Sequence, residues 1–144
     1  ESSFMIKDQE IIMMNGVAST LGKNVYNFEN VFIQNFDSSG KLVWESWVKK
    51  NQSSVNDGGM LGSVFIYNTE SSIYMLYNDP ISNGGDIVEA SFTPEGQRDM
   101  KIVAKGDEMN AMVIPLDGKQ ISGDKIVIPV LKDRKFALLK ITAR

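Results

Sequence analysis

The 144-residue chain contains no cysteine and no histidine. Together these absences exclude Ser-His-Asp and Cys-His catalysis, zinc sites built from His or Cys, haem sites and iron–sulfur clusters. They also exclude disulfide bonds, so cysteine usage neither supports nor opposes an exported location. Any chemistry in the chain must therefore use carboxylates, Lys, Arg, Tyr, Ser or Thr side chains, or a cation bound by oxygen atoms.

The chain also lacks a strong charge and a long apolar run. Its formal net charge is -3, which argues against nucleic acid or an anionic membrane surface as a partner, because both favour a basic protein. No run approaches the roughly 18 apolar residues that a membrane helix needs, so we expect no membrane insertion. The chain begins at Glu1 without an initiator Met or a signal peptide, which we interpret as the start of a processed or truncated product.

Helix patterns are scarce, because no long stretch places apolar residues at i, i+3, i+4 and i+7 between plausible caps. Strand patterns are frequent instead, as short runs of Ile, Val, Phe, Tyr and Trp between clusters of Asp, Asn, Gly and Ser. We therefore predict an all-β protein made of antiparallel hairpins. The predicted strands pair as 5–7 with 10–14, 30–36 with 42–48, 64–68 with 73–77, 87–92 with 100–104 and 126–131 with 135–141, and a single strand covers 111–114.

The hairpins recur along the chain. Those at 4–14, 64–77 and 128–141 share one plan, and hairpins of a second kind lie between them. Two hairpins per period give four antiparallel strands, as in a propeller blade. We predict a single domain or fragment, 1–144, forming a partial β-propeller. Its blade-like, repeat-like units are expected at roughly 1–62, 63–124 and 125–144. The alternative is a β-sandwich whose hairpins merely look alike.

Two stretches resemble a known group of proteins: "VFIYNTESSIYMLYND" at 64–79 and "MVIPLDGKQISGDKIVIPVLKDRKFALLKI" at 112–141. They are similar to the C-terminal part of uncharacterised β-propeller-like proteins of Bacteroidetes-type bacteria. The resemblance covers roughly residues 60–144. It implies a propeller-like fold in an exported bacterial protein, which would be periplasmic, on the cell surface or secreted. It transfers no catalytic residue, and the chain is too short to close a ring of blades.

The strand at 73–77 ends in an aromatic and acidic cluster. Alternation places Ile73, Met75 and Tyr77 on one face and Tyr74, Leu76 and Asn78 on the other. Both faces are largely apolar, as expected for a strand buried between stacked sheets. We expect Asn78 and the residues after it to bond the turn backbone and end the strand at Pro80.

The loop that follows carries oxygen ligands. Asp79, Asn83 and Asp86, with carbonyl groups freed by the glycines between them, are hard ligands that suit Ca²⁺. Their spacing does not match the D-x-[DN]-x-[DN]-G calcium loop. The interpretation as a simple turn therefore stays open beside that of a calcium site.

Aromatic residues are the candidates for binding. Trp44 and Trp47 are three residues apart and face opposite sides of one strand. One is expected in the core, and the other on an edge or interface, where it could stack on a sugar or pack against another chain. Tyr77, beside the acidic cluster, is the third candidate binding residue. Core positions for both tryptophans remain the alternative.

These features favour a binding function over catalysis. We predict a non-catalytic binding or scaffold module that recognises a protein or glycan through loops, namely the long Gly/Ser/Asn-rich connections at 15–30, 50–63 and 78–86. Its other expected partners are the rest of its precursor chain or copies of itself, because exposed edge strands recruit further strands. The alternative is part of a glycosidase-like hydrolase, completed by another segment, with Glu45 and either Glu89 or Glu95 as its carboxylate pair.

Overall fold

The computed structural model describes residues 17–20, 23–81 and 85–142, and this part of the chain is all-β, as predicted. It has one helical turn, α1 (Gly106–Met109), and one 3-10 turn, η1 (Pro115–Asp117), in addition to its strands. No helix in the described ranges is long and apolar enough to span a membrane. The strands are β1 (Val17–Thr20), β2 (Lys23–Phe28), β3 (Val31–Phe36), β4 (Leu42–Val48), β5 (Gln52–Val55), β6 (Phe65–Asn68), β7 (Ile73–Asp79), β8 (Asp86–Phe92), β9 (Arg98–Ala104), β10 (Ala111–Val113), β11 (Lys119–Ser122), β12 (Lys125–Lys132) and β13 (Lys135–Thr142).

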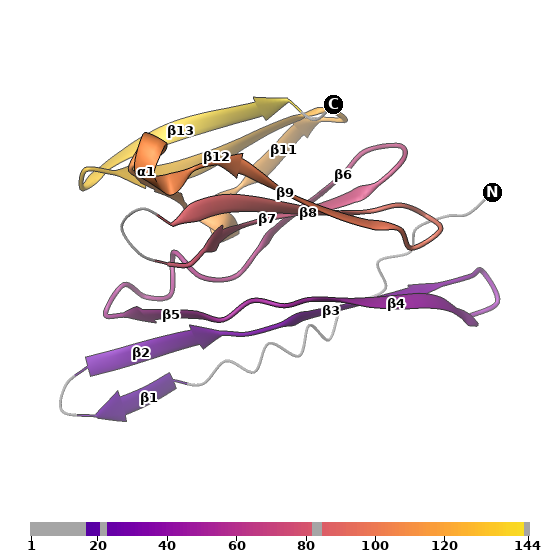
Figure 1. The fold of residues 1–144 in the computed structure, drawn as a ribbon, viewed down its shortest axis with the longest axis horizontal. Coiled ribbons are helices and arrows are strands. Elements are labelled where there is room, and N and C mark those ends of the chain that lie inside the picture. The colour runs from indigo at the N-terminus through magenta and orange to yellow at the C-terminus, as the bar shows by residue number, and fades with distance from the viewer. Residues whose placement is uncertain (1–16, 21–22, 82–84, 143–144) are drawn as a thin grey trace.

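The strands form three layers (Figure 1). The first layer holds the sheets β1-β2-β5 and β3-β4, which Figure 1 shows end to end. The middle layer is the antiparallel sheet β6-β7-β8-β9, in chain order. In the third layer, β13 pairs with β12 along its whole length, so β10 and β11 share the other edge of β12.

The middle sheet is covered on both faces. One face packs on the third layer through a cluster that includes Leu76, Ile87 and Ile128. The other face packs on β3 and β4 through a second cluster that includes Tyr77 and Phe92. Two buried faces explain why β7 reads as an almost continuous apolar run, and they confirm the predicted division of its side chains between the two sides.

Four predicted hairpins are confirmed, in the pairs β3–β4, β6–β7, β8–β9 and β12–β13. The predicted hairpin at 4–14 lies outside the described residues. The segments 15–30 and 50–63 were predicted as long connections, and this was wrong, because they contain β1, β2 and β5. β5 is the polar run "QSSV", and its strand conformation depends on antiparallel pairing with β2, which is distant in the chain.

The predicted repeat units can be compared with the boundaries of the observed sheets. The middle layer lies within the predicted unit 63–124. The third layer includes residues on both sides of position 125, because β11 pairs with β12. The division into units 1–62, 63–124 and 125–144, with its propeller or sandwich packing, therefore stays a prediction.

Candidate functional site

The two tryptophans lie on opposite faces of β4, as their spacing predicts. Trp44 points toward the middle sheet, where its Nε1 donates a hydrogen bond of 2.7 Å to the Pro94 carbonyl. Its ring stacks on Phe92 with the centroids 6.2 Å apart. Trp47 points away from the middle sheet and is 50% exposed. Its ring lies against Phe32, with a centroid distance of 4.5 Å.

The third candidate binding residue, Tyr77, lies in the core. It is fully buried, and its hydroxyl group has no hydrogen-bond partner within the described structure. Burial raises the pKa of this hydroxyl to about 12. An external ligand cannot reach this side chain without opening the second core cluster, so the geometry leaves Trp47 as the accessible member of the three.

The predicted calcium ligands lie around the β7–β8 connection. Asp79 and Asp86 are directly opposite each other in the β7–β8 pairing. The Asp86 Oδ1 atom accepts a 3.0 Å hydrogen bond from the Gly106 amide, so part of this carboxylate is already used. Asn83 lies outside the described residues. In the described ranges no three His, Cys, Asp or Glu residues gather as a metal site, and calcium binding stays a prediction.

Of the carboxylates of the alternative hydrolase, Glu45 and Glu89 do not share a site. Glu89 is buried on the face of the middle sheet that packs on the third layer, where it accepts a hydrogen bond from the Tyr67 hydroxyl and pairs with Lys101 Nζ at 2.7 Å. Burial raises the pKa of the Tyr67 hydroxyl above its usual range. Glu45 lies on the outer face of β4, so the middle sheet and a core cluster separate it from Glu89. Glu95 is exposed in the β8–β9 turn.

A buried polar network that the sequence did not indicate connects all three layers. Asn78 is fully buried, and its Nδ2 donates to the carbonyls of Leu61 and Val113, both at 2.8 Å. Its Oδ1 accepts from the Val113 amide at 2.9 Å. The Asn78 carbonyl accepts from Gln52 Nε2 at 2.7 Å. The prediction that Asn78 bonds its own turn was wrong, because β7 continues to Asp79 and the side chain bridges neighbouring segments instead.

Lys50 is attached to the end of this network. Its Nζ donates to Gln52 Oε1 at 2.6 Å and to the Phe28 carbonyl at 3.4 Å. The same atom lies 5.7 Å from the centroid of the Phe28 ring. Burial lowers the pKa of this amine to about 8. We interpret the network as a structural connection between layers, because every described contact of Lys50 is to another part of the fold.

The outer face of the third layer exposes large apolar side chains. Ile126, Ile128 and Val130 of β12 point into the core, so the residues between them face outward. On β13 the outward residues Phe136 and Leu138 are 69% and 73% exposed. We name this surface the C-terminal end face; it comprises Met112, Val127, Pro129, Leu131, Phe136, Leu138 and Lys140.

A second outward surface lies at the opposite side of the stack. Val31 and Val48 are core residues of β3 and β4, so the neighbouring Phe32 and Trp47 point away from the middle sheet. We name this surface the N-terminal end face; it comprises Phe32, Gln34, Val43, Glu45 and Trp47. The two end faces are therefore separated by the whole thickness of the molecule (Figure 1).

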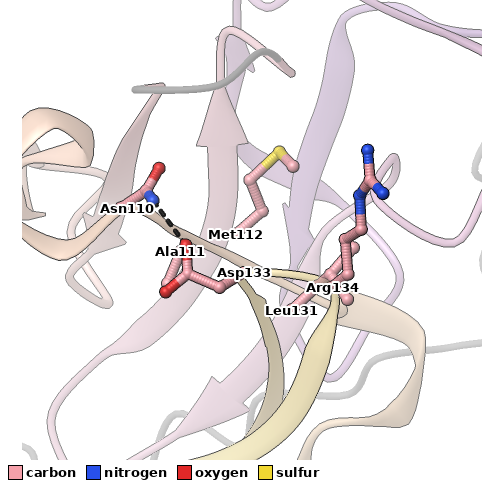
Figure 2. Close-up of a pocket in the computed structure, with 6 residues that line it drawn as sticks. All are labelled: Asn110, Ala111, Met112, Leu131, Asp133 and Arg134. Atoms are coloured by element: carbon pink, nitrogen blue, oxygen red, sulfur yellow. Dashed lines mark hydrogen bonds between the residues drawn. The ribbon is translucent and has the colours of Figure 1, made fainter.

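A hollow of about 260 Å³ opens at one end of the C-terminal end face (Figure 2). Met112 and Leu131, which are opposite each other in the β10–β12 pairing, contribute its apolar side chains. Asp133 accepts a 2.8 Å hydrogen bond from Asn110 Nδ2 at the rim. Figure 2 shows the Arg134 side chain extended, with its guanidinium group directed away from Asp133. The hollow thus combines an apolar surface with an accessible cation.

Comparison with known proteins finds no family model, no curated protein and no solved structure that matches this chain.

Proposed function

We propose that this chain is a non-catalytic binding or scaffold module that engages a protein through its exposed end faces. The observation that carries the proposal is the exposure of Phe136 and Leu138 on β13, beside further apolar residues of β12. Large apolar side chains that stand together on one surface are typical of protein–protein contact sites. This proposal replaces loops with sheet faces as the recognition surface, because the segments 15–30 and 50–63 contain strands.

Three sheets packed face to face also suit a propeller-like protein. Propeller blades are four-stranded antiparallel sheets, and the middle layer has this form. In such a protein the end faces would be the positions of the neighbouring blades. On the resemblance of residues 60–144 described above, we propose that the chain belongs to an exported bacterial protein, in the periplasm, on the cell surface or secreted. Its partner would supply the next packed layer.

Site-specific photo-cross-linking tests the proposed surface. The substitution Phe136→p-benzoylphenylalanine puts a photoreactive group on the C-terminal end face, in a side chain of similar character. The matched control carries the same group at Glu70, an exposed residue of the β6–β7 turn. After irradiation with an envelope extract of the source bacterium, position 136 should give protein adducts that position 70 does not.

Two results would contradict the proposal. The first is an identical adduct pattern from positions 136 and 70. The second is turnover of p-nitrophenyl glycosides that Glu45→Gln or Glu89→Gln abolishes, which would establish the carboxylate-dependent hydrolase instead. A glycan array that binds the chain while no protein adduct forms would assign the recognition to sugar rather than protein.

A further inference from the structure

The two end faces of the molecule differ in shape. The N-terminal end face carries an exposed aromatic pair, since Trp47 is 50% exposed and lies against Phe32. The C-terminal end face carries the hollow lined by Met112, Leu131 and Arg134. A methionine sulfur contacts aromatic rings favourably, and an Arg guanidinium group favours the face of a tryptophan ring. The chemistry of each face thus suits the other.

The two end faces also differ in charge. Glu45 lies between Trp47 and Val43 on the N-terminal end face, and the described hydrogen bond of its carboxylate is a long one of 3.5 Å from Gln34 Nε2. Lys140 lies beside Leu138 on the C-terminal end face. In the described residues neither charge has an ion-pair partner, because the single ion pair there joins Lys101 to Glu89. The N-terminal end face therefore presents the negative charge of Glu45, and the C-terminal end face presents the positive charge of Lys140, each next to apolar side chains.

Charge decides which pair of faces can meet. Each C-terminal end face carries Lys140, with Arg134 at its hollow, so contact between two C-terminal end faces would bring like charges together. Contact between an N-terminal and a C-terminal end face instead brings Glu45 and Lys140 to the same interface. A contact between two different surfaces of identical chains is heterologous, and it produces rings or open stacks of copies rather than a simple two-fold dimer.

We propose that the C-terminal end face binds the N-terminal end face of a second copy of this chain. In the complex Trp47 of one copy lies in the hollow beside Arg134 of the next, and Glu45 pairs with Lys140. The contact adds another sheet to the existing stack. The new sheet packs through an apolar face, in the same way that the middle layer packs on both of its neighbours. This inference rests on the proposed function and names the protein that the end faces bind.

A charge exchange followed by sedimentation velocity tests the inference on the full chain. The wild type should associate as its concentration rises from 1 µM to 1 mM, at a low salt concentration where charge pairing is least screened. Glu45→Lys and Lys140→Glu should each weaken association at least tenfold, because each leaves two like charges at every contact. The matched control Glu70→Lys makes the same charge change away from both end faces and should associate like the wild type.

Mixing the two variants gives the decisive result. In an equimolar mixture, every contact between Glu45→Lys and Lys140→Glu chains again joins opposite charges, so association should return to near the wild-type strength. A wild type that stays monomeric at 1 mM, or a mixture that associates no better than its separate components, overturns the inference. If the wild type stays monomeric while position 136 still cross-links to another protein, only the identity of the partner is wrong and the proposed function stands.

Discussion

The buried position of Lys50 favours the neutral form of its side-chain amine. Burial lowers its pKa from 10.5 to about 8, although the negative charge of Asp79 acts in the opposite direction. In the unfolded chain the amine keeps its proton up to its ordinary pKa. Between about pH 8 and 10.5 the unfolded state therefore binds more protons than the folded state, and the stability of the fold rises with pH across this window.

The size of this effect can be measured against a variant that does not titrate. The difference between the two pKa values corresponds to roughly 3 kcal/mol, which is the upper limit of the gain. In urea unfolding at pH 7 and pH 10, the free energy of unfolding of the wild type should increase by up to that amount relative to Lys50→Met. Parallel pH profiles for the two proteins would show that Lys50 keeps its ordinary pKa.

Asn78 should be among the most sensitive positions of the chain. Replacing it by Ala leaves three buried backbone groups without partners: the carbonyls of Leu61 and Val113 and the Val113 amide. Each unsatisfied group costs about 1–3 kcal/mol, so we expect Asn78→Ala to lower the free energy of unfolding by roughly 3 kcal/mol or more. The exposed Asn68 is the control, and Asn68→Ala should change it by less than about 0.5 kcal/mol. Similar losses for both variants would contradict a bridging role for Asn78.

At the scale of elements, two hairpin turns of the same form differ in their surroundings. Gly40 in the β3–β4 turn and Gly96 in the β8–β9 turn both have φ of +83°. A Cβ atom on Gly40 would meet nothing within 4 Å, whereas one on Gly96 would lie 2.7 Å from Cγ of Trp44. The second turn is therefore a packing contact between the first and middle layers, and the first turn is free in solvent.

Alanine at the two glycines separates backbone strain from packing. Gly40→Ala should lower the free energy of unfolding by about 1 kcal/mol, which is the strain of a Cβ atom in the left-handed region. Gly96→Ala should cost about 1–3 kcal/mol more, because it also overpacks the Trp44 ring. Urea unfolding of both variants measures the difference. Equal losses would mean that the β8–β9 turn moves away from Trp44 without cost.

Much of this element structure could be predicted from the sequence. Hairpins with apolar strands and short Asp- or Gly-containing turns were identified, and the division of β7 between two cores followed from strict alternation. β5 could not be predicted, because "QSSV" has little strand preference and depends on pairing with β2. The role of Asn78 was also hidden, since its partners Leu61 and Val113 are distant in sequence.

The candidate surface was predictable only in part. The spacing of Trp44 and Trp47 correctly placed them on opposite faces of β4. On β13, however, both alternating sets are apolar, with Phe136 and Leu138 on one side and Leu139 and Ile141 on the other. Sequence alone could not say which set the fold covers. A strand that is apolar on both faces is typical of a sheet that is covered on both sides. When only one face is buried, as on β13, we expect a further layer on the other face.

At the scale of the whole molecule, the three layers have two inner contacts and two open end faces. The inner contacts are large apolar clusters, and the end faces also carry large apolar side chains, such as Trp47 and Phe136, that are exposed in the described structure. Burying such faces against a partner stabilises a complex in the same way that packing the layers stabilises the fold. The two end faces are therefore the basis of the binding function that we propose.

Hydroxyl-radical footprinting of the full chain, alone at low concentration and then with its partner present, tests this organisation most directly. The partner is either excess chain or an extract of the source organism. The readouts are oxidation at Trp47, Met112 and Phe136, with the exposed Met100 of β9 as an internal control. We predict that oxidation falls at one or both end faces and is unchanged at Met100. Unchanged oxidation at all three end-face residues, with protection elsewhere on the chain, would contradict an end-face binding module.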